Sequence, residues 1–301
     1  MLAAAHPRRR RWLDAAFLLL GAALIVLSLG TLAALLLDLL RDGLSRLSLE
    51  FLTSFPSRKP DQAGVKSAIV GTCAVMFVTA VTALPLGVAS GIYLEEYARK
   101  NWRTAIIEIN IANLAGVPSI IWGLMALGLL VYALGLKRSI LTAGLTLGLL
   151  VLPIVIVATR EAIRAIPQGI REGAYALGAS RWQTVRHHVL PYSMSGILTG
   201  AIIAMSRAIG ETAPLITIGA LTYIAFLPPS PVTPSPPFVS LSWLDSPFTV
   251  LPIQMFNWVS RPDPRFHANA AAAGVVLMSI TLSMNALAIL LRYRSRRVIR
   301  W

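Results

Sequence analysis

Residues 160–191 read REAIRAIPQGIREGAYALGASRWQTVRHHVLP, and residues 192–214 continue with YSMSGILTGAIIAMSRAIGETAP. The first segment is basic and carries residues that begin and end short helices. Pro167 suits a helix start because its missing N–H would be unpaired there, and Gly178 can adopt the left-handed conformation that closes a helix. Ser180 and Gln183 have the spacing of a capping box for a second helix, which Pro191 is expected to end. The sequence therefore predicts a helix pair followed by a long apolar helix.

Both short helices are predicted to carry a narrow apolar stripe among polar residues. Ile170, Ala174 and Leu177 fall on one face of the first helix, and Trp182 and Val185 fall on one face of the second. Such stripes on a basic loop predict a partner surface.

The apolar run from Met194 to Tyr223 is interrupted only by Arg207 and Glu211. An ionisable side chain near the centre of a bilayer is costly, so such residues usually face a protein-lined cavity and mark the path of a substrate or ion. Their four-residue separation predicts that both lie on one helix face. The alternative is a structural ion pair that holds helices together.

Composition identifies an all-α, polytopic membrane protein. Of 301 residues, 56% are hydrophobic and 13% are charged, and the mean hydropathy is +0.69. These values exclude a soluble two-domain protein. The net charge of +14 and the helix pair would suit nucleic acid, but the flanking apolar runs are long enough to span a bilayer, so no nucleic-acid partner is predicted. Cys73 excludes an intrachain disulfide and is expected to be a small core residue.

Six apolar segments are predicted to cross the membrane: Ala15–Leu37, Ser67–Ile92, Thr104–Leu136, Ile140–Thr159, Met194–Tyr223 and Ala268–Leu291. They divide the chain into a basic tail (1–14), a first span with an external segment (15–66), a domain of five membrane helices (67–291) and a second basic tail (292–301). Within the domain lie the basic loop (160–191) and a proline-rich external loop (227–266), where 249–259 is apolar but too short to span. Lipid is therefore a partner of most of the chain.

Glycine and proline residues predict how these spans pack and bend. Pro118 should kink the third span because proline removes a backbone hydrogen bond. Small residues four positions apart allow close approach of membrane helices. The spacing is found in the pairs Gly87/Gly91, Gly144/Gly148 and Gly196/Gly200.

The distribution of basic residues predicts the orientation. Six spans place both termini on one side, and this side carries seventeen of the 27 Lys and Arg residues, whereas the opposite loops carry nine. By the positive-inside rule both termini and residues 160–191 are cytoplasmic.

The chain lacks the motifs of an enzyme. It contains no phosphate-binding G-x-x-x-x-G-K-[ST] loop, and its four histidines show no metal-ligand spacing with carboxylates or with Cys73. We therefore expect no catalytic residue and no metal site.

The basic loop resembles the EAA loop of bacterial ABC importer permeases, which docks on an ATPase subunit. The residues that carry this resemblance are Glu172, Gly173, Ala174, Gly178, Leu190 and Pro191. Gly173 and His188 depart from it, since the family usually has alanine and an aliphatic residue there.

Residues 207–214, RAIGETAP, are similar to the signature of phosphate-specific permeases. Residues 246–252, SPFTVLP, and 283–287, SMNAL, resemble the PstA-type subunit in particular, and residues 114–119, LAGVPS, fit the same family. The resemblance implies a type I ABC importer permease fold in the bacterial inner membrane. It also implies a PstC-type permease as heterodimer partner, a PstB-type ATPase dimer that binds ATP and Mg, and a PstS-type extracytoplasmic binding protein. No cofactor is expected in this chain.

An arginine at membrane depth also suits phosphate on chemical grounds, because its planar fork matches an oxyanion. Arg207 would receive the anion, Glu211 would hold Arg207 when the path is empty, and Thr212 would add a hydroxyl. Permeases for sulfate or molybdate remain an alternative, as does a membrane scaffold or channel outside transport.

Overall fold

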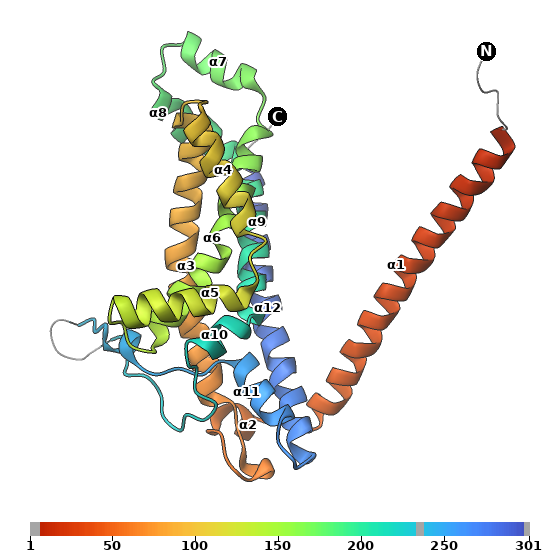
Figure 1. Cartoon of the computed structure of the whole chain (residues 1–301), viewed down its shortest axis with the longest axis vertical. Helices are drawn as coiled ribbons and strands as arrows, with labels where there is room; N and C mark the ends of the chain where they lie inside the picture. The colour runs from red at the N-terminus through yellow and green to blue at the C-terminus, as the bar shows by residue number, and fades with distance from the viewer. Residues whose placement is uncertain (1–6, 233–237, 298–301) are drawn as a thin grey trace.

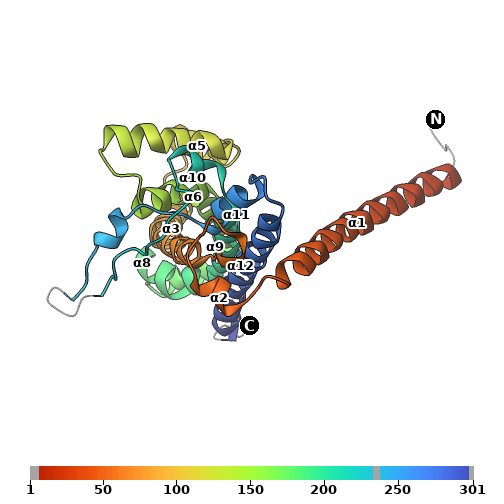
Figure 2. The same cartoon turned by 90° about the horizontal axis from the view of Figure 1, so that it is seen from below.

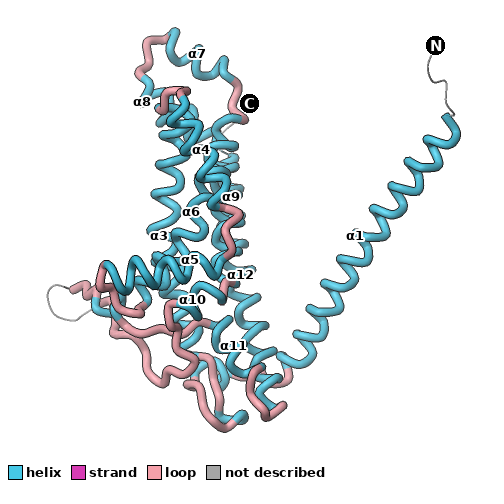
Figure 3. The backbone as a smooth tube through the Cα atoms, viewed as in Figure 1, coloured by secondary structure: helices cyan, strands magenta, loops and turns pink. Residues whose placement is uncertain are grey.

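The computed structural model describes residues 7–232 and 238–297, with side chains described for 12–232 and 238–294. Helices α3, α6, α9 and α12 run side by side as a bundle, and α1 stands apart from it (Figure 1). Loops gather at the end of the bundle that carries α2 and α11, whereas α7 and α8 lie at the other end, here called the loop end (Figure 3). Apart from an isolated bridge between Val232 and Val239, the regular structure of the described residues is helical.

The long helices are α1 (Pro7–Leu44), α3 (Lys66–Ile92), α6 (Ile140–Arg164), α9 (Leu190–Gly210) and α12 (Arg265–Arg297). The shorter α-helices are α2 (Leu49–Thr53), α4 (Trp102–Leu114), α5 (Ser119–Ala126), α7 (Gln168–Ala176), α8 (Arg181–Thr184), α10 (Ala213–Thr217) and α11 (Leu251–Val259). The 3₁₀ turns are η1 (Pro60–Gln62) and η5 (Ser242–Asp245), and the π turns are η2 (Tyr93–Tyr97), η3 (Leu127–Ala133) and η4 (Val185–Val189).

Five helices are long and apolar enough to cross a membrane, and a sixth crossing exists only if α4 and α5 with η3 are counted as one broken span. The expected third segment, Thr104–Leu136, is present as this bent pair, and the predicted break at Pro118 is confirmed. The two parts meet at 107°, because Pro118 caps α5 from an extended conformation instead of continuing α4. In Figure 1, α4 follows the bundle whereas α5 crosses it.

The fifth span differs from the expected Met194–Tyr223 at both ends. Pro191 does not end the helix pair, because α8, η4 and α9 form one continuous helix from Arg181 to Gly210. The π turn at Val185–Val189 widens the helix just before the proline, where a regular turn would clash with its ring. The helix then stops at Gly210, and the separate short helix α10 begins at Ala213, with Pro214 in its first turn.

Several other helices are longer than the sequence predicts. Helix α6 continues to Arg164, so Arg160 belongs to a helix and not to the loop, and Tyr93–Tyr97 prolongs α3 as a π turn. Helix α1 already includes Arg8–Arg11, which were expected to be a tail. The short apolar segment is α11, which is nine residues long and does not span. The proline-rich stretch is irregular at 227–231, whereas residues 233–237 lie outside the described residues.

The predicted glycine pairs are confirmed as sites of close helix contact. Gly87 and Gly91 lie against Val155 and Thr159 of α6, so a Cβ on Gly91 would be only 2.7 Å from Thr159 Cβ. The other two pairs behave in the same way: Gly144 and Gly148 face Val78 and Thr82 of α3, and Gly196 and Gly200 face Ala162 and Ala158 of α6. Helix α6 is therefore packed tightly between α3 and α9.

Helix α1 and Cys73 of α3 both lie on outer surfaces of the chain. Helix α1 leaves the bundle at its base, and none of its apolar membrane-length segment is buried (Figure 2). Cys73 is exposed on α3, so the expectation of a core residue is wrong. Its helix turns Thr72 and Val75 inward, which leaves Cys73 on the outer face.

Candidate functional site

Arg207 and Glu211 lie together where α9 ends. Arg207 occupies the last turn, and its Nε donates to Glu211 Oε1 at 3.4 Å. The two residues do not share a helix, because Glu211 is the extended residue after Gly210 (φ −76°, ψ 127°). The Arg207 side chain is 41% exposed, and in the described part of the chain its two terminal nitrogens donate to no protein acceptor. Most of the guanidinium fork is therefore available to an anion.

Thr212 follows directly and caps α10, where its carbonyl accepts hydrogen bonds from the N–H groups of Leu215 and Ile216. It is half-buried. The structure thus brings Arg207, Glu211 and Thr212 to one turn of chain at the junction of α9 and α10.

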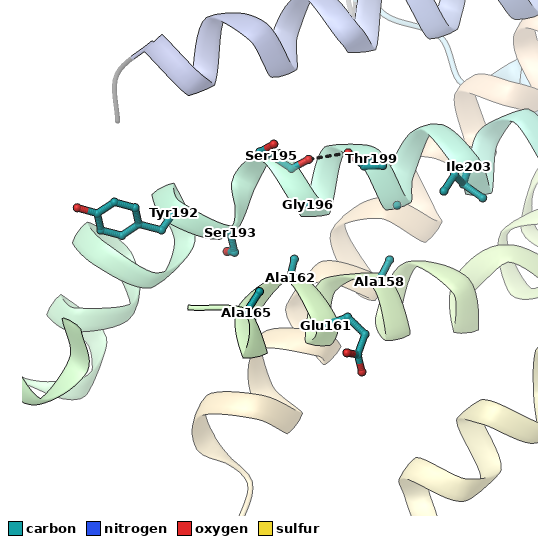
Figure 4. Close-up of a pocket in the computed structure, with 11 residues that line it drawn as sticks. Ala158, Glu161, Ala162, Ala165, Tyr192, Ser193, Ser195, Gly196, Thr199 and Ile203 are labelled. Atoms are coloured by element: carbon teal, nitrogen blue, oxygen red, sulfur yellow. Dashed lines mark hydrogen bonds between the residues drawn. The ribbon is translucent and has the colours of Figure 1, made fainter. Parts of the chain in front are cut away.

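A groove between α6 and α9 runs along α9 from Ile203 toward the loop end. It encloses about 740 Å³, and small side chains of both helices line it (Figure 4). Gly196, Gly200, Ile203 and Arg207 follow one another at helical spacing, so Arg207 continues the face of α9 that borders the groove. Ser195 and Thr199 are among the residues that line it, and the Thr199 hydroxyl donates to the carbonyl of Ser195. Sequence reasoning missed this groove, because only packing sets α6 against α9.

At the loop end, the signals that begin and end the two short helices around Gly178 are confirmed. Pro167 lies directly before α7, and Gly178 follows its end with φ +83°. Ser180 and Gln183 form the capping box of α8. Of the residues that resemble the EAA loop, Glu172, Gly173 and Gly178 are exposed, Ala174 is buried, and Leu190 and Pro191 lie half-buried in the first turn of α9.

The expected apolar stripes are each split between an inner and an outer surface. Ala174 and Val185 are buried, whereas Leu177 and Trp182 are 91% and 61% exposed. Leu177 is exposed because it follows the last residue of α7. The π turn after α8 changes the angle around the helix axis between Trp182 and Val185, so the two side chains do not share a face. Leu177 and Trp182 thus form an exposed apolar pair, one on either side of the Gly178 turn.

Residues 83–298 match the family model described as the inner membrane component of binding-protein-dependent transport systems. The chain belongs to this family. It is therefore an ABC importer permease, and the Arg207 junction and residues 160–191 lie at two places on it.

Curated relatives of the permease cover most of its length. It is 33% identical over 291 residues to the phosphate transport system permease protein PstA of Yersinia pestis, which covers 93% of this chain and 90% of the relative. It is 30% identical over 240 residues to PstA 1 of Mycobacterium tuberculosis, with 79% and 74% covered. It is also 32% identical over 250 residues to the probable ABC transporter permease protein YqgI of Bacillus subtilis, with 81% and 84% covered.

Solved structures show the same fold. The permease superposes on a chain of a bacterial ABC transporter that imports alginate with a TM-score of 0.63 and 14% identity, over 97% of this chain and 98% of that one. It also matches a chain of the MetNI methionine transporter with a TM-score of 0.51 and 19% identity, over 79% and 95%. The architecture is that of type I ABC importer permeases.

The permease also holds a cluster of ion pairs at the loop end that the sequence did not reveal. Arg160 Nη2 lies 2.6 Å from Glu108 Oε1, and Arg164 Nε lies 2.9 Å from Glu95 Oε2. Arg171 of α7 pairs with Glu96 at 2.7 Å. The sequence does show three acidic residues, Glu95, Glu96 and Glu108, close to spans that end in arginine. Which arginine each one pairs with depends on how α3, α4 and α6 meet.

Proposed function

We propose that this chain is the PstA-type permease subunit of an ATP-driven importer for inorganic phosphate. The observation that carries the proposal is Arg207 at the end of α9, with an unoccupied guanidinium fork on the face that borders the groove. Phosphate carries one to two negative charges at neutral pH, and arginine binds such anions through two parallel hydrogen bonds. Relatives named as phosphate permeases support this choice of substrate.

The path residues have distinct roles. Arg207 receives phosphate, Glu211 holds the guanidinium in place between transport cycles, and Thr212 adds a hydroxyl. Glu211 also competes with the anion for Arg207, which lets phosphate leave again toward the groove. The open groove along the contact of α6 and α9 then provides a route toward the loop end.

Energy reaches the path through the loop of residues 160–191. The exposed pair Leu177 and Trp182 supplies an apolar docking surface beside the Gly178 turn, and the partner is a PstB-type ATPase dimer that binds ATP and Mg. This chain itself is not an enzyme and holds no cofactor. The loop lies about 26 Å along α9 from Arg207, so the subunit works by conformational change and not by direct contact.

A PstC-type permease completes the path. The apolar surface of α1 is unburied in the isolated chain, and a second permease together with lipid would cover it. A PstS-type binding protein delivers phosphate to the end of the bundle opposite the loop. With seventeen basic residues on the side of the termini, the loop end is cytoplasmic and the protein is a multi-pass protein of the bacterial inner membrane.

The deciding experiment is to purify the complex with its second permease and ATPase and to reconstitute it with the binding protein. Phosphate should stimulate ATP hydrolysis, whereas sulfate and molybdate should not. Stimulation by sulfate or molybdate instead would assign the permease to another oxyanion. A chain that never associates with an ATPase would be a scaffold or channel.

A further inference from the structure

Helix α7 is held to the rest of the permease by few contacts. It lies beyond the end of the bundle and joins α6 and α8 through the short segments 165–167 and 177–180 (Figure 1). Of its nine residues only Ala174 is buried, and Ile170 is partly buried against Ile163, Ile166 and Val189. A displacement of α7 can therefore reach the membrane helices only through a small number of links.

Arg171 makes the strongest of these links. Its Nε and Nη2 donate to Glu96 Oε1 at 2.9 and 2.7 Å. Its Nη1 donates to the carbonyl of Ile166 at 3.0 Å, and its Nη2 also donates to the carbonyl of Ile163 at 3.0 Å. Within the described residues, it is the one side chain of α7 with a hydrogen bond outside that helix. All three nitrogens of one guanidinium thus connect α7 to two other elements.

The side chains of the Arg171–Glu96 ion pair are largely buried, which strengthens their attraction. The side chains of Arg171 and Glu96 are only 17% and 5% exposed, so water and salt screen their attraction far less than that of a surface pair. Glu96 lies in η2, which continues α3, and Ile163 lies in the last turn of α6. Helices α3 and α6 are themselves locked together by the contacts of Gly87, Gly91, Gly144 and Gly148.

We propose that Arg171 is a positioning residue that transmits the movement of α7 to the packed α3/α6 pair, and so couples the ATPase to the membrane path. This inference rests on the proposed function, and it adds a specific link to it. Movement of the ATPase against the exposed Leu177 displaces α7. The hydrogen bonds of Arg171 then move Glu96 and the end of α6 together with α7. Helix α6 forms one wall of the groove, which lies on the loop-end side of Arg207.

The neighbouring ion pairs provide a matched control. Arg164 is bonded to Glu95 at 2.9 Å and to Glu161 at 3.3 Å, at the same end of the bundle. These contacts join α6 to η2 and to α6 itself, and none of them involves α7. Arg164→Gln therefore removes an arginine from the same region without cutting the link to α7.

The test compares Arg171→Gln with Arg164→Gln in the assembled complex, with oxyanion uptake and ATP hydrolysis measured in the same vesicles. The parental complex shows first which oxyanion stimulates hydrolysis, and this result alone tests the proposed function. The role of Arg171 is then tested with that oxyanion. We expect Arg171→Gln to keep the ATPase bound and hydrolysing, while the ions transported per ATP fall at least about fivefold, the lower range of a typical coupling free energy. Arg164→Gln should keep the parental ratio.

A second pair of variants separates transmission from stability. Arg171→Gln leaves the buried Glu96 unpaired, so it can also reduce the amount of folded protein. The double variant with Glu96→Gln contains no unpaired buried charge and should recover the folded amount, yet it should remain uncoupled because two amides do not replace the fork. Recovery of coupling together with folding would overturn the proposal, as would a parental ratio in Arg171→Gln or loss of the ATPase from the double variant.

Discussion

Replacing Arg207 tests the substrate path most directly. Its contact with Glu211 is long, at 3.4 Å, and the two side chains are 41% and 19% exposed. Partly exposed pairs of this kind contribute up to about 1 kcal/mol. Arg207→Gln should therefore change the amount of folded protein little. The effect on transport should be larger, because each hydrogen bond to a charged group contributes about 1.5–3 kcal/mol. A fork with two such bonds accounts for at least about 3 kcal/mol, or a factor of about 100 in uptake.

The assay is initial uptake of radiolabelled phosphate, well below saturation, normalised to the amount of assembled complex. Arg207→Lys should recover only part of the rate, about tenfold below the parental value, because a point charge replaces a bidentate fork. Glu211→Gln should lower the KM and the maximal rate together, since the carboxylate that competes with phosphate for Arg207, and so lets it leave, is gone. If the pair is merely structural, the double variant Arg207→Gln, Glu211→Gln should transport at the parental rate. That result at matched protein level would remove Arg207 from the substrate path.

Further variants test orientation, coupling and packing. In a background without Cys73, cysteines at Ser180 and Ser230 should react with an impermeant reagent from opposite sides of the membrane; labelling of Ser180→Cys from outside intact cells would reverse the topology. Gly178→Asp should uncouple or release the ATPase, because a side chain at φ +83° is strained by about 1 kcal/mol and the new charge lies beside the apolar pair. Gly173→Ala, on an open face of the same loop, should keep transport intact and stabilise α7 by about 0.5–1 kcal/mol, so loss of uptake there would contradict the docking geometry. Gly91→Ala should destabilise the α3/α6 contact by about 1–3 kcal/mol, measured as a lower thermal midpoint, whereas Gly128→Ala, which meets no atom within 4 Å, should not; equal midpoints would refute the packing model.

Local signals in the sequence were sufficient for several features. The capping box of Ser180 and Gln183 and the left-handed Gly178 were predictable because each depends on residues no more than four positions apart. The glycine pairs were predictable for a related reason, since a four-residue repeat of small residues creates a flat helix face whatever helix it meets. The sequence also located Arg207 and Glu211 as the charges in an apolar run, although it placed them on one helix.

Proline was the least reliable of the sequence signals. Pro118 does break a span, Pro214 opens a new short helix, and Pro191 sits inside a continuous one. A π turn before Pro191 provides room for its ring, whereas Pro85 of α3 and Pro153 of α6 lie inside helices without such a turn. Whether such a turn forms depends on neighbouring helices that re-satisfy the freed backbone groups, and local sequence does not describe them.

The sequence by itself determined the membrane class, most helices and the two chemically important segments, because hydropathy and helix periodicity are local properties. Only the tertiary structure decided that Cys73 faces outward and that α6 and α9 leave a groove on the loop-end side of Arg207. It also decided that Arg171 meets Glu96, 75 residues away in the chain. Each of these depends on which faces of distant helices meet. That choice is made by close packing of small residues along the whole bundle, and no short stretch of sequence contains it.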